Sequence, residues 1–248
     1  MMKLEKNLYK DCAEYYDLVV DKKEIQKEVE FISRLFNKFK VKTALDVGCG
    51  TGLYLIPLKR KKFDIEGLDL SINMLKEVRK KSKTIKLHKK DMSNFKINKK
   101  YDAIICLSST LIILPNFKII KKTIKNLYKH LSPGGILILD LPNHLKEIKE
   151  KNNLKEHESH NTPKGKLNFT FLSYKKGNKW IEEWYGVTKR KNKVLKFKDT
   201  WEELIYSPKE LESSLKKAGF NILKIHGSMK GIKFDKNKSY RRTYLCKK

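Results

Sequence analysis

The sequence predicts an α/β fold in which crossover helices cover a mostly parallel sheet, with a small antiparallel lid added to it. Short β-branched runs alternate with amphipathic helical stretches through the middle of the chain, as in parallel sheets. A glycine-rich turn follows the first run, and strands of alternating polarity follow the last one. At 248 residues the chain is long for one domain and short for two, which favours a single domain with an insertion.

The parallel part of the sheet is expected to follow a helix at 24–39, whose apolar residues recur with helical spacing. Helices should open near Leu53, at Ser71, which is a good N-cap, and near Asn116. The sequence Ser132-Pro-Gly-Gly135 is expected to form the turn before the last of these strands. Strands are predicted at 41–47, 64–69, 85–88, 103–107 and 136–141.

The rest of the chain changes character after Leu141. Residues 143–166 are polar and mixed, so we expect a helix fragment and a loop. Alternating strands should follow at 168–174, 180–189 and 194–206, joined by hairpin turns at 176–179 and 191–193. A helix capped by Ser207-Pro208 and stopped by Gly219 then leads to the last two strands, at 222–226 and 243–246.

Composition excludes several classes of protein. The hydrophobic fraction of 40% is sufficient for a packed core, and no apolar run approaches the roughly 20 residues that cross a bilayer. The N-terminus lacks the apolar region of a signal peptide. The four cysteines are scattered without a metal-like cluster. These features predict a reduced, cytoplasmic protein that does not enter a membrane.

The net charge of +29 has two interpretations. Only six of the 57 basic residues are arginine, although arginine supplies the bidentate contacts typical of nucleic-acid recognition. Lysines spread over every predicted element favour a compositional bias. A polyanionic partner such as RNA remains the alternative, because a field of this sign attracts one.

One glycine-rich segment, residues 45–52, indicates a ligand site where the first strand should turn into its helix. Gly48, Gly50 and Gly52 would let the backbone approach a ligand closely and adopt positive φ. A dinucleotide fingerprint is the competing interpretation, but its third glycine position falls on Leu53. Asp46 would repel a pyrophosphate, whereas it suits a ligand that carries an ammonium and a sulfonium.

Acidic residues follow the next two strands. Asp69 ends the second strand, a position from which a carboxylate can accept both ribose hydroxyls. Asp91 and Met92 follow the third strand, where the carboxylate can bind an adenine amino group and the thioether can lie on the ring. Their order after consecutive strands favours a nucleoside site over helix caps.

These segments resemble the successive motifs of class I S-adenosylmethionine (SAM)-dependent methyltransferases. The resemblance covers about residues 43–140 and implies a Rossmann-like fold with a mostly parallel seven-stranded sheet and one antiparallel strand. A second resemblance is to small-molecule N-methyltransferases of amino sugars and glycine. The segments that carry both resemblances are LDVGCGTG, GLDLS with Met74, KDM, YDAIICLSS, LSPGGILILD, Tyr9-x3-Ala13-x2-Tyr16-Asp17, and Cys106-Leu-Ser-Ser109, in which Leu107 replaces an aromatic residue.

The resemblance implies a domain organisation and a set of site residues. The chain would be one methyltransferase domain, 1–248, with cofactor-covering helices at 1–40, a SAM-binding core at 41–142 and 207–248, and an inserted lid at 143–206. Tyr16 and Ser108 would act in catalysis. The cofactor, SAM, would be bound by Tyr9, Asp46, Gly48, Cys49, Gly50, Thr51, Gly52, Asp69, Leu70, Met74, Asp91, Met92 and Leu107.

We therefore expect an enzyme that transfers a methyl group to a small-molecule acceptor, an amine nitrogen, by direct in-line SN2 displacement. An RNA or protein methyltransferase and a non-catalytic SAM-binding protein are the alternatives. A homodimer is compatible with the sequence. No metal is expected, because His157-x2-His160 lacks a nearby third ligand.

Side chains of the lid are candidates for contact with the substrate. Strand alternation leaves open which face of the lid looks inward. The candidates are Glu182, Glu183, Trp184, Tyr185, Trp201 and Tyr206.

Overall fold

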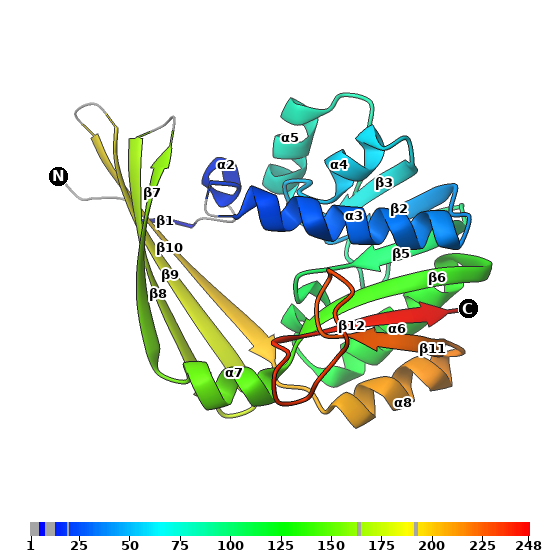
Figure 1. Ribbon diagram of the computed structural model, residues 1–248. Coiled ribbons are helices and arrows are strands. Elements are labelled where there is room, and N and C mark those ends of the chain that lie inside the picture. Colours follow the sequence, from blue (N-terminus) through cyan, green and yellow to red (C-terminus); the bar gives the residue numbers. More distant parts are fainter. Residues whose placement is uncertain (1–4, 8–12, 19, 163–164, 191–192) are drawn as a thin grey trace.

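The computed structural model describes residues 5–7, 13–18, 20–162, 165–190 and 193–248, which form two sheets and their helices (Figure 1). The larger sheet has seven strands in the order β11-β12-β6-β5-β2-β3-β4. Only β12 runs antiparallel to its neighbours, which confirms the predicted fold class. The strands of this larger sheet are β2 (Thr43–Val47), β3 (Asp64–Asp69), β4 (Leu87–Lys89), β5 (Tyr101–Cys106), β6 (Leu131–Pro142), β11 (Asn221–His226) and β12 (Arg241–Lys247).

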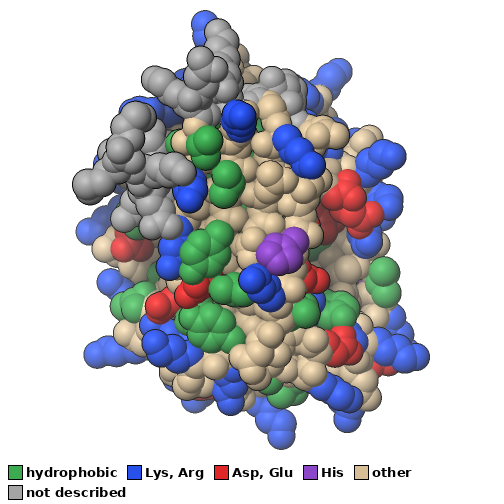
Figure 2. Space-filling model, turned by 90° about the vertical axis from the view of Figure 1, so that its left-hand side faces the viewer, with side chains coloured by type: hydrophobic (Ala, Val, Ile, Leu, Met, Phe, Trp, Pro, Cys, Tyr) green, Lys and Arg blue, Asp and Glu red, His purple; other side chains and the backbone are tan. Residues whose placement is uncertain are grey.

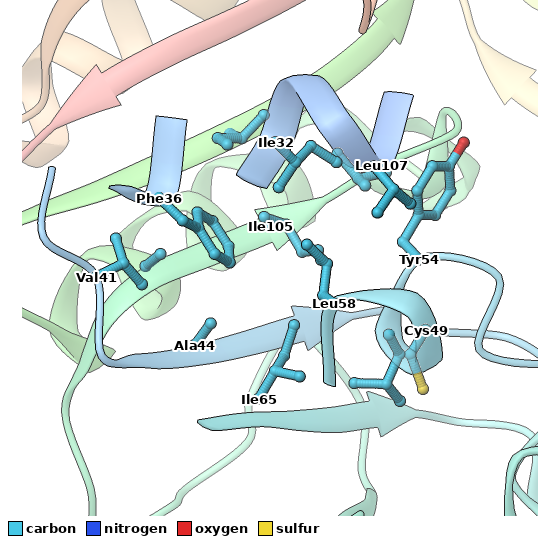
Figure 3. Packing of buried hydrophobic residues seen from close by; sticks show 14 of the residues in the cluster. Ile32, Phe36, Val41, Ala44, Cys49, Tyr54, Leu58, Ile65, Ile105 and Leu107 are labelled. Atoms are coloured by element: carbon cyan, nitrogen blue, oxygen red, sulfur yellow. The ribbon is translucent and has the colours of Figure 1, made fainter. Parts of the chain in front are cut away.

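Helices cover both faces of this sheet because its central strands are apolar on both sides. Ala44 of β2 packs in one core, with α3, α4 and α5, whereas Leu45 packs in the other, with α6 and α8. Figure 3 shows Ile32 and Phe36 of α3 pointing toward Ala44 and Ile105. The bounds of these helices are α3 (Lys22–Lys38), α4 (Leu55–Arg60), α5 (Ile72–Lys81), α6 (Phe117–His130) and α8 (Pro208–Ala218).

The predicted helix signals act as expected. Ser71, Asn116 and Ser207 each accept a backbone N–H of the following turn with the side chain, which satisfies an otherwise unpaired donor. Gly219 ends α8 at φ 107°, a conformation that favours glycine. A short 3₁₀ turn, η1 (Thr110–Ile113), follows β5.

The second sheet has five strands in the order β1-β10-β9-β8-β7 and stands beside the larger one (Figure 1). The short helix α2 (Ala13–Tyr16) lies between the second sheet and the helices α3 and α5 (Figure 1). Chain connections enter the sheet through α7 (His144–Lys151) and leave it toward α8. The strands are β1 (Glu5–Asn7), β7 (Leu154–Thr162), β8 (Gly165–Lys176), β9 (Lys179–Arg190) and β10 (Lys193–Leu204).

Three sequence-based expectations were wrong. The loop expected within 143–166 contains β7, because pairing with β8 satisfies the backbone of a polar segment without an apolar pattern. Residues 5–7 form a strand parallel to β10, where we expected helix. Ser132-Pro-Gly-Gly135 is not a separate turn, since β6 already starts at Leu131, opposite Tyr101.

None of the helices within the described ranges is both long and apolar enough to cross a membrane.

Candidate active site

The glycine-rich loop after β2 has the backbone conformation that its sequence predicts. Gly48, Gly50 and Gly52 all have positive φ, at 75°, 52° and 86°. A Cβ on Gly48 would lie 2.2 Å from Thr110 Cγ2, whereas a Cβ on Gly50 would have no atom within 4 Å. The loop therefore packs tightly at its first glycine and faces open space at its second, where a ligand can approach the backbone.

Two buried carboxylates lie under this loop. The Gly50 and Ser71 backbone N–H groups donate to the two oxygens of Asp69, each over 2.8 Å. Asp46 is only 2% exposed, and its Oδ2 has no hydrogen-bond partner among the described residues. Burial, together with the nearby Asp69 charge, raises the pKa of Asp46 to about 8. An orphaned buried oxygen of this kind marks a place for a donor or a cation.

A strained turn follows β5 opposite the loop. Ser108 and Ser109 both have positive φ, 50° and 64°, which costs about 1 to 2 kcal/mol each for a residue with a side chain. Ser108 Oγ lies 3.4 Å from the Tyr54 hydroxyl, which donates to Glu28 over 2.7 Å. Arg241 Nη1 donates to Ser109 Oγ over 3.2 Å. These contacts fix the turn, and with it the Ser108 side chain.

The N-terminal segment is tied to the glycine loop through Asp17. Its carboxylate accepts hydrogen bonds from the Thr51 hydroxyl and from the Lys81 ammonium, and Lys81 also donates to the Thr51 carbonyl over 2.9 Å. Tyr16 thereby lies against the second sheet, with its ring centroid 5.9 Å from that of Trp201. Burial and the adjacent Asp17 raise the pKa of Tyr16 to about 12, so its hydroxyl stays protonated at neutral pH.

These parts enclose a cavity of about 130 Å³ between the glycine loop, the Ser108 turn and β10. Eight predicted site residues line it, and both predicted catalytic residues are among them. The lining residues are Tyr16, Asp46, Gly48, Cys49, Gly50, Thr51, Leu53, Tyr54, Leu107, Ser108, Thr110, Ile113, Trp201 and Glu203.

The remaining predicted residues do not line this cavity. Gly52 faces Ile56 and Val78. Met74 is fully buried, so in this conformation it supports α5 and offers no ligand surface. At the ends of β3 and β4 lie Asp69, the 67% exposed Leu70, and the partly exposed Asp91 and Met92. Tyr9 lies outside the described residues.

The register of the second sheet decides which of its faces looks inward. Trp201 lies opposite Glu182, and the Trp184 ring packs against Trp201 at a tilt of 47° with ring centroids 4.4 Å apart, so all three share the cavity face. Glu183 and Tyr185 bond to each other on the opposite face. A glycine is required opposite Phe197, because a Cβ on Gly186 would lie 1.8 Å from its ring. Tyr206 is buried and donates to the Pro142 carbonyl over 2.9 Å, away from the cavity.

Several polar residues at this site were not predicted from the sequence. Tyr54 and Glu203 line the cavity, and Glu203 belongs to a cluster with His144 and Glu147. No local motif marks this cluster, because its members come from α7 and from a strand about 56 residues further along the chain. The signal available was a histidine and a glutamate one helical turn apart, directly after a buried strand.

Two buried cysteines, Cys49 and Cys106, lie near the site. Burial raises the pKa of the Cys49 thiol well above its usual range and raises that of the Cys106 thiol as well. Cys106 is fully buried in the core, as its strand context predicted. The arrangement can therefore bind a cationic ligand and align two reactants, and burial disfavours a thiolate at Cys49 and at Cys106.

His157 and His160 of β7 bond to different partners, Thr170 and Glu158. Within the described ranges, the group of side chains spaced for a metal ion is instead His144, Glu147 and Glu203.

Comparison with known proteins gives a family match over most of the chain. A family model described as a methyltransferase domain matches residues 20–225. Among curated relatives, a dTDP-3-amino-3,6-dideoxy-α-D-glucopyranose N,N-dimethyltransferase of Streptomyces fradiae is 30% identical over 134 residues, or 52% of each chain. A glycine/sarcosine N-methyltransferase of Halorhodospira halochloris is 32% identical over 145 residues, or 53% of this chain and 54% of its own.

The chain spans about half the length of these curated relatives. One solved structure is similar to this chain over nearly its whole length. An S-adenosylmethionine-dependent methyltransferase of Clostridium acetobutylicum is similar with a TM-score of 0.82 and 25% identity, covering 95% of this chain and 96% of its own.

Proposed function

This chain belongs to the methyltransferase domain family, and from that membership we propose that it is a SAM-dependent N-methyltransferase of small-molecule amines. The observation that carries the proposal is the cavity in which the glycine loop, the Ser108 turn and the second sheet meet. Its lining provides a place for a cationic methyl donor and an adjoining place for one small acceptor.

The residues present fit SAM. The ammonium and sulfonium of SAM complement the buried Asp46 carboxylate, whose Oδ2 lacks a partner in the described part of the chain. The open space at the Gly50 Cα admits the methionine portion against the backbone. When bound, SAM supplies a methyl group on a good leaving group, so what remains for the protein is alignment of the acceptor nitrogen.

Residues beyond the cavity would hold the nucleoside. Asp69 is proposed to face the ribose, although both of its oxygens already accept backbone N–H groups. A carboxylate has about four lone-pair positions, so it can accept ribose hydroxyls as well. The exposed Leu70, with Asp91 and Met92, is proposed to lie against adenine. Leu107 and Ser108 would flank the sulfonium from the turn after β5.

A small acceptor fits this site better than RNA. Trp201 and Glu203 of the second sheet close the cavity against Tyr16, which leaves room for one small molecule. Relatives named as methyltransferases of an amino sugar and of glycine/sarcosine support an amine nitrogen. Figure 2 shows Lys and Arg side chains scattered over the outer face of the second sheet, without one continuous basic groove. On the face shown, the basic side chains are dispersed, which supports a compositional origin of the charge.

A screen with radiolabelled SAM tests the proposal. We expect label on small amines, and not on alcohols or bulk tRNA. The apparent affinity for the amine should change by less than about twofold between 50 and 200 mM salt, because few phosphate contacts exist to release counterions. Transfer to tRNA, with affinity falling by orders of magnitude over that range, would contradict the proposal and favour the RNA alternative. SAM binding without transfer to any acceptor would favour a non-catalytic binding protein.

The Asp46 pKa predicts that SAM binding depends on pH. In the unliganded protein Asp46 is protonated below about pH 8, because its folded-state pKa lies above the ordinary value of 3.8. SAM favours the carboxylate, so binding should release a proton and SAM affinity should rise between pH 6 and 7.5. The rise cannot exceed tenfold per pH unit for one proton.

Calorimetry in buffers of different ionisation enthalpy measures this proton release. The Asp46→Asn variant should bind SAM more weakly and without the pH dependence. If that variant keeps the wild-type slope, a group other than Asp46 titrates.

A further inference from the structure

A cluster of three ionisable side chains lies where the second sheet meets the larger one. His144 and Glu147 are one turn apart on α7, and Glu203 is on β10. His144 Nε2 lies 3.1 Å from Glu203 Oε2, and one donor atom of each residue lies within 4.8 Å of the other two. We call His144, Glu147 and Glu203 the acidic subsite.

The acidic subsite is incompletely satisfied. The His144 side chain is 3% exposed, and its Nδ1 has no hydrogen-bond partner among the residues described. Glu147 Oε2 is likewise buried without a described partner. Burial raises the pKa of Glu147 to about 7. Arg241 also acts electrostatically on both glutamates. Buried polar atoms are normally paired, so the unpaired His144 Nδ1 and Glu147 Oε2, next to the Glu203 carboxylate, favour a ligand that forms hydrogen bonds here.

The acidic subsite opens into the cavity through Glu203, which lines it together with Trp201 and Tyr16. Trp184 backs Trp201, with ring centroids 4.4 Å apart, and Glu182 lies on the same face. Aromatic faces attract ammonium ions through the ring quadrupole and are the usual walls of sites for alkylated ammonium groups. The carboxylates and the aromatic rings at this place therefore both favour an ammonium ion as the ligand.

The charges of the residues that line the cavity further restrict the class of acceptor. The chain has 57 lysines and arginines, yet no lysine, arginine or histidine occurs among the described lining residues of the cavity, whereas Asp46 and Glu203 do. A phosphate or carboxylate on the acceptor would find no cationic partner there. The site thus favours a compact cation over a nucleotide-linked sugar.

We propose that the acidic subsite binds the acceptor amine as an ammonium ion and that Glu203 takes its proton; this inference rests on the proposed methyltransferase function. Glu203 accepts a hydrogen bond from the ammonium N–H, and His144 positions Glu203 by donating through Nε2. The proton moves to the Glu203 carboxylate and frees the nitrogen lone pair. That pair forms the N–CH₃ bond as the C–S bond breaks, its electrons stay on sulfur as a thioether, and the product is the methylated ammonium ion.

Binding of a non-reactive cation tests the subsite without turnover. Tetramethylammonium chloride is titrated by calorimetry into protein saturated with S-adenosylhomocysteine, the demethylated product. Wild type and the Glu202→Gln control should bind it equally, because the Glu202 side chain is 50% exposed and next to Glu203 in sequence. Glu203→Gln should bind it at least tenfold more weakly. Equal binding by the two variants would overturn the subsite.

Measurements of methyl transfer distinguish a failure of this inference from a failure of the proposed function. For an amine that accepts label, kcat/KM of the Glu203→Gln variant should fall at least a hundredfold, the lower range for a general base, while SAM affinity is unchanged. If wild type binds no SAM, the proposed function fails. If wild type methylates amines and Glu203→Gln matches Glu202→Gln, only the subsite fails.

Two further experiments use Mn²⁺ and nucleotide-linked amino sugars as probes. Micromolar Mn²⁺ binding that Glu203→Gln abolishes would replace the ammonium subsite by a metal site, since the three donor atoms are spaced for one. Nucleotide-linked amino sugars that react faster than small amines would overturn the inferred acceptor class.

Discussion

Replacing Gly50 with leucine is expected to weaken SAM binding at least a hundredfold while the protein stays folded. The Gly50 Cα borders the cavity, and a Cβ built on it points into space that contains no protein atom within 4 Å. A leucine side chain would occupy part of a cavity of only about 130 Å³, so it competes directly with the ligand. A hundredfold loss corresponds to about 2.7 kcal/mol of binding free energy.

Gly177 provides a matched control for this substitution. It lies at the tip of the β8–β9 hairpin with φ 59°, close to the 52° of Gly50, and its Cβ would also meet no atom within 4 Å. Both leucine variants therefore carry the same backbone strain, about 1–2 kcal/mol. Thermal unfolding should shift equally in the two, whereas calorimetry should find SAM binding lost only in Gly50→Leu. Equal SAM affinity in both variants would place the donor elsewhere.

Local signals predicted the larger sheet well. The second strand of that sheet was predicted at 64–69, which matches β3, and Ser71 caps the following helix as expected, because both depend on neighbouring residues. The glycine loop was predictable for the same reason, since positive φ at alternate positions restricts the residue type. The polar β7 was missed because only its pairing with β8 makes it a strand.

The cavity was predictable only in part. Asp46 lies near the end of β2, Gly50 follows β2 and Ser108 follows β5, and the carboxyl ends of parallel strands meet at one edge. Trp201 and Glu203 share a face by alternation, and Glu203 reaches the same cavity because the register of β10 against β9 turns that face inward. Alternation in the sequence gives two faces without saying which one is inward, and a shift of one residue would reverse them.

A buried ion pair joins the core to the strained turn at the cavity. Asp140 on β6 is fully buried, and it accepts hydrogen bonds from Arg241 Nη2, from Arg241 Nε over 3.1 Å and from Thr243 Oγ1 over 2.8 Å. The Ser109 N–H donates to the Asp140 carbonyl over 3.1 Å, while Arg241 holds the Ser109 hydroxyl. The positive φ of Ser108 and Ser109 is thus maintained by contacts to this pair.

The Asp140→Leu variant should therefore lower the free energy of unfolding by about 3 kcal/mol, the lower end of the cost of leaving a buried charge unpaired, since Arg241 is 28% exposed. Glu202→Leu, which breaks the exposed pair with Lys179, should cost less than about 1 kcal/mol. Urea denaturation measures both. The double variant Asp140→Leu/Arg241→Met should recover part of the loss, because no charge is then left unpaired. If Asp140→Leu costs no more than Glu202→Leu, the buried pair does not stabilise the core beside the turn.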